Sequence, residues 1–331
     1  MQALVYTAPE KTEVRDEPRP KPAPGEVEVA VEVAGICGSD ISGFLGHSAL
    51  RKPPLILGHE LVGRVNGKRV VANPLISCGT CESCVAGRQN TCVSWRLLGL
   101  GQTQGSYAEF VALPASQLYE IPESVSSASA VMAEPLANLV HLFRIASPAP
   151  MFRLAIVGAG TMGALALLVA RLSGARDILL ADVNDERLAT ARKLGAMVTA
   201  NTSTEAGVEE AKRAAGRGFD LVIDASGSAA ARQLAFDLCR PGGLVALLGM
   251  GAQSSEINFV ASIRKEHRVV MSFAYTPGDF RQALDLIFAG KVDLQNWTEQ
   301  MPLAQGQLAF ERMTRQPGST LKMLLAVAAA S

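Results

Sequence analysis

Residues 153–182 read RLAIVGAGTMGALALLVARLSGARDILLAD. An apolar run of strand length, 154–157, breaks at a glycine-rich turn, and a helical apolar pattern follows to about Leu172. Gly174 ends that helix, and a second apolar run, 178–181, ends on Asp182, which lies 19 residues after Gly163. The order strand, glycine turn, helix, strand and acidic residue predicts one βαβ unit of a doubly wound parallel sheet.

The glycine turn, GAGTMG at 158–163, has the spacing of a dinucleotide-binding loop. Gly158 permits a tight turn, Gly160 lets backbone N–H groups approach a pyrophosphate, and Gly163 lets the helix lie close to the sheet. Asp182 would accept hydrogen bonds from the adenosine ribose, and Arg187 would stack on the adenine. Tight packing of a helix on a turn is the alternative explanation of the glycines, but the surrounding strands favour dinucleotide binding.

Length and composition limit the possible classes of protein. A chain of 331 residues is long enough for two domains, and its 48% hydrophobic content can fill a large core. Lysine plus arginine equals aspartate plus glutamate, at 31 each, which gives no electrostatic reason to expect nucleic acid or an anionic membrane as a partner. The first residues lack the pattern of a signal peptide, so we expect a cytoplasmic protein.

The rest of the chain is organised around the βαβ unit. Short alternating strands at 3–6 and 27–33, joined by the proline-rich link 18–25, predict a mostly β region to about residue 119. A helical pattern covers 126–146, and strands then alternate with helices over 153–273, which predicts a six-stranded parallel sheet in an α/β protein. The predicted helices are 185–194, 205–215 and 229–239; the predicted strands are 197–200, 221–225, 244–248 and 269–273; a turn is predicted at 241–243, and two helical patterns and a strand at 321–327 follow Tyr275.

Four cysteines lie within 15 residues, at Cys78, Cys81, Cys84 and Cys92. Four thiolates at this spacing can form a closed tetrahedral zinc site, which predicts a structural role for the metal. Unrelated cysteines are rarely so dense, and a redox pair would need only two of them. We therefore expect a zinc-stabilised loop in a reducing compartment.

A second set of chemistry-bearing residues is dispersed along the chain. Cys37 lies in GICGSD, His59 and Glu60 lie in LGHE, and Glu134 lies in AEPL. Each alone has a plain explanation: a small core residue, a buried histidine, or a charge on a helix surface. Their occurrence together with the cysteine cluster and the dinucleotide turn indicates a second metal site.

Taken in order, GICGSD, LGHE, the four-cysteine lobe, EPL, GAGTMG and the terminal Asp182 resemble the zinc-dependent medium-chain dehydrogenases/reductases, in particular the sorbitol and polyol dehydrogenase branch. The resemblance runs over essentially the whole chain. It implies a GroES-like, mostly β catalytic domain at 1–137 and 274–331 and a Rossmann NAD-binding domain at 138–273. It also implies a catalytic zinc, and dimers or tetramers.

The resemblance also assigns roles to residues. Cys37 and His59 would ligate the catalytic zinc, and Glu60 would be a ligand or lie beside one. Glu134 occupies the position at which polyol dehydrogenases have a glutamate, either on the metal or on its water. Ser39 matches the hydroxyl that accepts the substrate proton, and Asp40 would support the loop that carries the zinc ligands.

The implied reaction is hydride transfer from a secondary alcohol or polyol to NAD, with zinc stabilising the alkoxide. An L-threonine or amino-alcohol dehydrogenase of the same family is one alternative, and a non-catalytic nucleotide-binding protein of the same fold is another. The expected cofactor-binding residues, the last three at the ends of later strands, are Gly158, Gly160, Thr161, Met162, Gly163, Asp182, Arg187, Ala225, Gly249 and Phe273.

Three features depart from the family pattern. Ser42 stands where many members have a relay histidine, so the proton would leave through the ribose hydroxyls and water rather than through His47. The segment 61–70 after GHE is shorter than usual. Ala274-Tyr275 replaces the Arg-Tyr pair of sorbitol dehydrogenases, which argues against sorbitol itself as the substrate.

Overall fold

The computed structural model describes residues 1–327 and divides the chain into two compact units. The first comprises Met1–Ala137 and Tyr275–Ser331, and the second comprises Asn138–Ala274. The predicted domains placed residue 274 in the first unit, whereas Ala274 belongs to the second. Residues 328–331 of the predicted catalytic domain lie outside the described residues.

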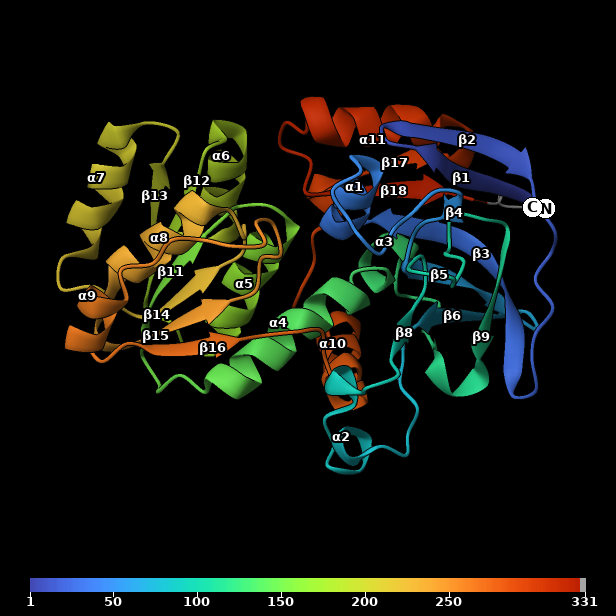
Figure 1. Ribbon diagram of the computed structural model, residues 1–331, viewed down its shortest axis with the longest axis horizontal. Coiled ribbons are helices and arrows are strands. Elements are labelled where there is room, and N and C mark those ends of the chain that lie inside the picture. Colours follow the sequence, from blue (N-terminus) through green and yellow to red (C-terminus); the bar gives the residue numbers. More distant parts are fainter. Residues whose placement is uncertain (328–331) are drawn as a thin grey trace. The chain divides into compact units, whose positions relative to one another are not determined.

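The first unit is built mainly from antiparallel strands (Figure 1). A seven-stranded sheet has β3 (Glu26–Ile36) near its middle, and the blue β3 and the red β18 (Lys322–Ala326) lie side by side. Met323 pairs with Ile36 and Leu325 with Ala34, so the end of the described chain completes the sheet begun near its start. The other strands are β5 (Glu60–Val65), β6 (Lys68–Ala72), β9 (Phe110–Pro114), β10 (Leu118–Glu120) and β17 (Thr298–Pro302) in this sheet, β1 (Gln2–Ala8), β2 (Lys11–Asp16) and β4 (Leu55–Ile56) in a second, and β7 (Leu75–Ile76) and β8 (Arg96–Leu97) in a third.

Helices of the first unit cover or follow these sheets. They are α1 (Gly38–Phe44), α2 (Glu82–Val85), α3 (Ser127–Ala130), the first residues of α4 (Ala133–Ala146), α10 (Pro277–Phe288) and α11 (Gly306–Arg315). The rings of Phe44 on α1 and Phe310 on α11 stack with centroids 4.8 Å apart, and Tyr107 meets Phe310 edge-on. These fully buried aromatic side chains join the two ends of the sequence into one core.

The second unit is a doubly wound parallel sheet, as predicted (Figure 1). Its strands lie in the order β13 (Val198–Asn201), β12 (Asp177–Asp182), β11 (Arg153–Val157), β14 (Phe219–Asp224), β15 (Cys239–Leu247) and β16 (Arg268–Met271). All neighbouring pairs are parallel. The connecting helices are α5 (Thr161–Leu172), α6 (Asp185–Leu194), α7 (Glu205–Ala215), α8 (Ala229–Leu238) and α9 (Phe259–Arg264).

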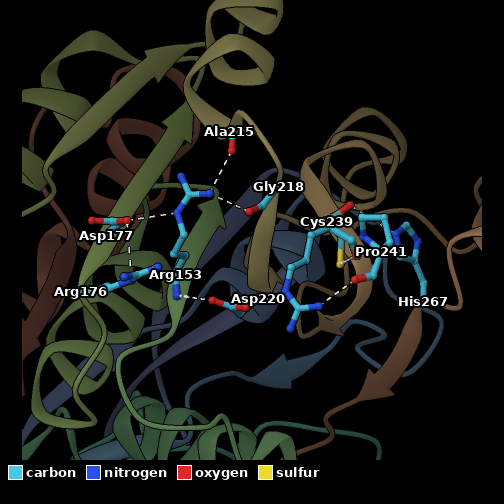
Figure 2. A network of polar contacts seen from close by, with 10 residues as sticks. Arg153, Arg176, Asp177, Ala215, Gly218, Asp220, Cys239, Pro241 and His267 are labelled. Atoms are coloured by element: carbon cyan, nitrogen blue, oxygen red, sulfur yellow. Dashed lines mark hydrogen bonds and ion pairs between the residues drawn. The ribbon is translucent and has the colours of Figure 1, made fainter.

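Charged residues tie together the edge of this sheet at which the strands begin (Figure 2). The Arg153 guanidinium donates to the carbonyl oxygens of Ala215 and Gly218, at 3.1 and 2.8 Å, and to Asp177. Asp220 accepts from the Arg153 backbone N–H at 2.7 Å and from Arg240 Nε at 2.6 Å. This edge is therefore a structural clamp. The opposite edge, where the strands end, carries the glycine turn.

Two local predictions were wrong, and one strand was not predicted. The helix predicted over 126–146 is two helices, α3 and α4, and β17 was not predicted. The turn at 241–243 is a bulge inside β15, because Phe219 pairs with Cys239 and Leu221 with Leu244. The segment 61–70 forms the hairpin β5–β6, whose Asn66-Gly67 turn has φ angles of 50° and 80°.

Candidate functional site

Three of the predicted metal ligands meet in the first unit. Cys37 follows β3 and precedes α1, while His59 and Glu60 enter β5, which pairs with β3 so that Gly35 lies opposite Glu60. One ligand atom from each of Cys37, His59 and Glu60 lies within 4.8 Å of the others. Thiolate, imidazole and carboxylate are the ligands that zinc prefers, so this set fits a zinc ion.

A buried carboxylate, Asp40, orients the histidine. His59 Nδ1 lies 3.4 Å from Asp40 Oδ1, which leaves Nε2 as the ring nitrogen that can ligate a metal. The Tyr107 hydroxyl donates to Asp40 Oδ2 at 2.9 Å, and the Cys37 backbone N–H donates to the same oxygen at 3.3 Å. Asp40 is thus placed to support the ligands, in the role that the resemblance implied.

The charges around His59 and Asp40 favour positive charge on the His59 imidazole. Burial alone would lower the pKa of His59, but Asp40 and Cys37 raise that pKa well above the usual value. Burial alone would raise the pKa of Asp40, yet His59 and Arg51 keep it well below its usual range. Negative groups that stabilise a proton on the ring will also stabilise a metal ion there.

Glu60 has a partner that sequence reasoning missed. Lys322 Nζ, on β18, lies 2.7 Å from each carboxylate oxygen of Glu60 and 3.3 Å from the Ile36 carbonyl oxygen. Both charged side chains are buried. A Cβ on Gly35 would overlap the Glu60 carboxylate, so glycine is required opposite it. Lys322 already neutralises Glu60, which fits a position beside the metal better than permanent ligation.

Glu134 lies in the first turn of α4 and is buried. Burial raises the pKa of its carboxyl, against the opposing effect of His59, and its interaction with the Tyr275 hydroxyl lowers that pKa. Glu134 is not among the side chains whose ligand atoms lie within 4.8 Å of Cys37, His59 and Glu60. The structure therefore places it near the zinc ligands, in contact with Tyr275.

The side chains around the ligands were mostly beyond sequence reasoning. Lys322 offered one signal, because a lysine opens an otherwise apolar strand. Tyr275 was noticed only as part of a missing Arg-Tyr pair. Tyr107 and Arg51 gave no signal, because long-range pairing brings them to Asp40.

The four-cysteine lobe surrounds α2 in the first unit. Its sulfur atoms lie close together, with Cys81 and Cys84 at 3.5 Å and Cys78 and Cys84 at 3.9 Å, and all four cysteines form one group of possible ligands. Backbone N–H groups of Cys81 and Ser94 point to the sulfurs of Cys78 and Cys92. The described cysteines form no disulfide, so the thiols remain available for zinc.

Backbone donors also prepare the thiolates. N–H groups of Thr80 and Cys81 lower the pKa of Cys78 to about 6, whereas burial raises the pKa of Cys84 to about 11. A cation at the centre would favour the thiolate form of both. The donor set and its surroundings therefore fit a closed zinc site.

In the second unit, the glycine turn and Asp182 meet at the ends of β11 and β12. Asp182 accepts hydrogen bonds from the backbone N–H groups of Ala159, at 2.5 Å, and Asn184, at 2.8 Å. A Cβ on Gly163 would overlap the Gly158 carbonyl oxygen, so helix packing requires the third glycine. Thr161 and Met162 form the first turn of α5, directly after Gly160.

A cavity of about 300 Å³ lies beside this turn. It is lined by Val157, Gly158, Ala181, Asp182, Val183, Thr202, Val208, Ser226, Ser228, Ala230, Ala231, Gln233, Leu234 and Asp237. Arg187 is absent from the lining. Its Nη1 would lie 3.8 Å from a Cβ on Gly160, so its guanidinium is beside the glycine turn, and adenine stacking stays a prediction.

The three late-strand candidates follow the carboxyl ends of their strands. Ala225 comes directly after β14, and Gly249 and Phe273 each come two residues after β15 and β16. A Cβ on Gly249 would overlap the backbone of Gly227, so close packing of two loops explains this glycine. Their position at the carboxyl edge of the sheet is compatible with nicotinamide contact.

Comparisons with known proteins agree with this geometry. Residues 23–123 match the model of the alcohol dehydrogenase GroES-like domain, and residues 161–289 match that of the zinc-binding dehydrogenases. The chain belongs to the zinc-dependent medium-chain dehydrogenase/reductase family. It is an oxidoreductase of the alcohol dehydrogenase type, and the prediction of the family is confirmed.

Individual relatives resemble the chain over nearly its whole length. D-xylulose reductase A of Aspergillus oryzae is 32% identical over 322 residues, covering 91% of this chain and 88% of that protein. An alcohol dehydrogenase of Escherichia coli CFT073, solved with NADH, is 27% identical with a TM-score of 0.90, covering 98% and 99% of the two chains. A dehydrogenase-like protein of Sinorhizobium meliloti 1021, solved with NADP, is 28% identical with a TM-score of 0.88, covering 98% of each chain. Within residues 1–327, no helix of this family member is long and apolar enough to cross a bilayer.

Proposed function

We propose that this enzyme oxidises a secondary alcohol or polyol with NAD at a zinc ion held by Cys37 and His59. The observation that carries the proposal is the convergence of the half-buried Cys37 with the buried His59 and Glu60, with the buried Glu134 close by. One of its relatives is named as a D-xylulose reductase. The candidate ligands Cys37, His59 and Glu60 include only one thiolate, so a metal held there would be harder than at a two-thiolate site and would suit an oxygen-rich substrate.

The residues of this chain divide the work of the reaction. When bound, zinc acts as a Lewis acid that lowers the pKa of the alcohol and stabilises its alkoxide. Ser39, two residues after Cys37 on α1, accepts the alcohol proton. Glu134 accepts a hydrogen bond from the substrate or from water, while Asp40 keeps His59 in the orientation that ligation needs.

A screen of NAD reduction tests this proposal. C3 to C6 polyols, simple secondary alcohols, L-threonine and sugar phosphates would be compared by kcat/KM with the zinc-loaded enzyme. We expect the highest values among polyols or vicinal secondary alcohols. A preference for L-threonine would move the enzyme to the amino-alcohol branch, and no turnover with any substrate would contradict the proposal.

Asp182 supports NAD as the cofactor. Its carboxylate is fixed at the end of β12 and lines the cavity, where it can accept from both ribose hydroxyls but would repel a 2′-phosphate. We expect kcat/KM to favour NAD over NADP by about a hundredfold, roughly 2.7 kcal/mol. Asp182→Ala should reduce this preference mainly by weakening NAD. Equal kcat/KM values for the two cofactors in the wild-type enzyme would contradict the assignment.

Arg187 supports a different contact from the one first expected. Its guanidinium lies beside Gly160 rather than in the cavity, so it is placed to offset the charge of a pyrophosphate. Arg187→Met should therefore weaken the binding of NAD and NADP alike, because both cofactors carry the pyrophosphate.

A homodimer is the proposed assembly. β16 ends the six-stranded sheet, and its Met271 is 77% exposed. The preceding helix α9 buries none of its residues and exposes Phe259, Val260 and Ile263. An apolar edge strand calls for a cover, and antiparallel pairing with the same strand of a second copy supplies one by two-fold symmetry. Met271→Asp should lower the mass measured by light scattering to that of a monomer. A dimer of unchanged stability would contradict this interface.

The proposed compartment is the cytoplasm. Six cysteines are free in the described chain, four of them arranged for a metal, which suits a reducing environment.

A further inference from the structure

Arg51 is a buried arginine that the proposed reaction has not yet used. It lies in the connection between α1 and β4, and its side chain is 7% exposed. Its Nη2 donates to Ser39 Oγ at 3.0 Å, and its Nε lies 3.4 Å from Asp40 Oδ1. One guanidinium therefore contacts both the predicted proton acceptor and the carboxylate that supports His59.

The chain makes room for this side chain. Gly43 lies on α1, and a Cβ there would stand 2.5 Å from Arg51 Cδ and 3.1 Å from Arg51 Cβ. The Arg51 backbone N–H donates to Ser48 Oγ at 3.2 Å. The Arg51 backbone is thus held by a hydrogen bond, and its aliphatic stem packs against Gly43, where no side chain would fit. Its guanidinium is held by Ser39 and Asp40.

The chemistry of the two groups restricts the serine. A hydroxyl has one hydrogen to donate and two lone pairs, whereas a guanidinium has donors and no acceptor. The Arg51 contact therefore occupies one lone pair of Ser39 and cannot receive its hydrogen. One lone pair remains to accept the proton of a substrate hydroxyl, and the hydrogen already on Ser39 must pass to an acceptor other than Arg51.

We propose that Arg51 is a positioning residue that fixes the direction of the Ser39 hydroxyl for proton acceptance from the substrate. The inference rests on the proposed function, because it needs Ser39 to act on an alcohol. The fork of the guanidinium suits this task, since it reaches Ser39 and Asp40 at once, which the single ammonium of a lysine does not reproduce.

The experiment compares Arg51→Met with Arg69→Met in the zinc-loaded enzyme. Arg69 is a matched control, because it is also buried and donates to a serine hydroxyl, that of Ser127, at 3.1 Å, outside the ligand cluster. Arg51→Met should lower kcat and kcat/KM at least about tenfold and raise the solvent deuterium isotope effect on kcat. Arg69→Met should lower the Tm by a similar amount and leave kcat and the isotope effect within about twofold of wild type.

Two further variants keep the test valid if Arg51→Met folds poorly. Gly43→Ala keeps the charge but displaces the Arg51 stem, and it should reproduce the loss of kcat. Arg51→Lys should recover only part of the loss. Zinc content per chain and the Tm, measured without turnover, should be close to wild type in both variants, which separates positioning of Ser39 from loss of the metal.

Ser39→Ala distinguishes failure of the inference from failure of the proposed function. The inference alone would be overturned if the wild-type enzyme turned over, Ser39→Ala were deficient and Arg51→Met were unimpaired. A loss of kcat in Arg51→Met that follows its loss of zinc would also overturn it. Wild-type kcat in Ser39→Ala would remove the role of Ser39 and the inference with it. No turnover by the wild-type enzyme would overturn the proposed function itself.

Discussion

The cysteines of the four-cysteine lobe come from 15 consecutive residues, whereas Cys37, His59 and Glu60 are brought together by the pairing of β3 with β5. The lobe has little core of its own: Cys78 is exposed, and so are the neighbouring Val85 and Val93. The second site is enclosed by buried charged residues, among them Asp40, Glu60 and Lys322. Both sites fit zinc, yet their surroundings differ in kind.

The difference indicates what each metal does. In the lobe, four sulfur ligands would fill a tetrahedral zinc site, and the ion would take the place of an apolar core. In the second site, strand pairing and ion pairs hold the candidate ligands. A pre-formed site with fewer protein ligands leaves a position for substrate, as catalytic zinc requires.

The largest expected effect comes from exchanging one ligand in each site. Cys37→Ser should reduce turnover at least about a thousandfold, because Lewis-acid stabilisation is worth several kcal/mol, while the Tm and NAD affinity stay near wild type. Cys84→Ser should instead lower the Tm and increase proteolysis near the lobe. Kinetics, thermal unfolding and limited proteolysis measure these effects. If both variants changed turnover and stability equally, the two sites would not differ in role.

Removal of the Lys322 charge should have the next largest effect, which is a loss of stability. Lys322→Met leaves Glu60 as a buried, unpaired charge and should lower the free energy of unfolding by about 3–5 kcal/mol. Lys68 offers a matched control, since its ion pair with Glu120 is exposed, and Lys68→Met should cost less than about 1 kcal/mol. Denaturant unfolding measures both, and similar losses would show that the buried pair has no special role.

Glu134→Gln should lower kcat about tenfold or more and leave the fold unchanged. Burial raises the pKa of Glu134 in the folded protein, so the folded chain keeps this proton at a pH where the unfolded chain has lost it. The metal-free protein should therefore gain stability as the pH falls through the folded pKa, and Glu134→Gln should lack that gain. Wild-type kcat in the variant would make Glu134 a structural residue.

The smallest effect is expected at His47, which is exposed and outside the buried network. Its backbone N–H donates to the Ser42 carbonyl oxygen at 2.9 Å, so the His47 backbone lies next to Ser42, the position at which many family members have the relay histidine. We still expect the ribose hydroxyls and water to carry the proton, and His47→Ala should change kcat less than about twofold across the pH–rate profile. A large loss that imidazole buffers restore would show that His47 is the relay.

Much of the fold could be predicted because its signals are local. The bounds of α6 and α7 agree with the predicted helices, since Asn184 and Thr204 cap their starts with side-chain hydrogen bonds and Gly195 ends α6 in the left-handed region. The strand β17, with the polar sequence TEQMP, escaped prediction because only its pairing with β18 defines it.

The metal ligands could be proposed from motifs, but their surroundings could not. Arg51, Tyr107 and Lys322 reach Asp40 and Glu60 across 11 to 262 residues of sequence, and no spacing rule connects positions so far apart. Arg187 shows the converse: its position in the first turn of α6 was clear, but the direction of its side chain was not. Motifs give the ligands, whereas tertiary pairing decides which charges accompany them.

Metal analysis with timed chelation tests the central claim that the chain holds two zinc ions in two different roles. We predict two zinc ions per chain in the wild-type protein. One should leave quickly to a chelator together with activity and return with it, and the other should exchange slowly. Cys37→Ser should retain only the slow ion. A single zinc ion per wild-type chain that depends on Cys78 and Cys81, with activity unaffected by Cys37→Ser, would contradict the account.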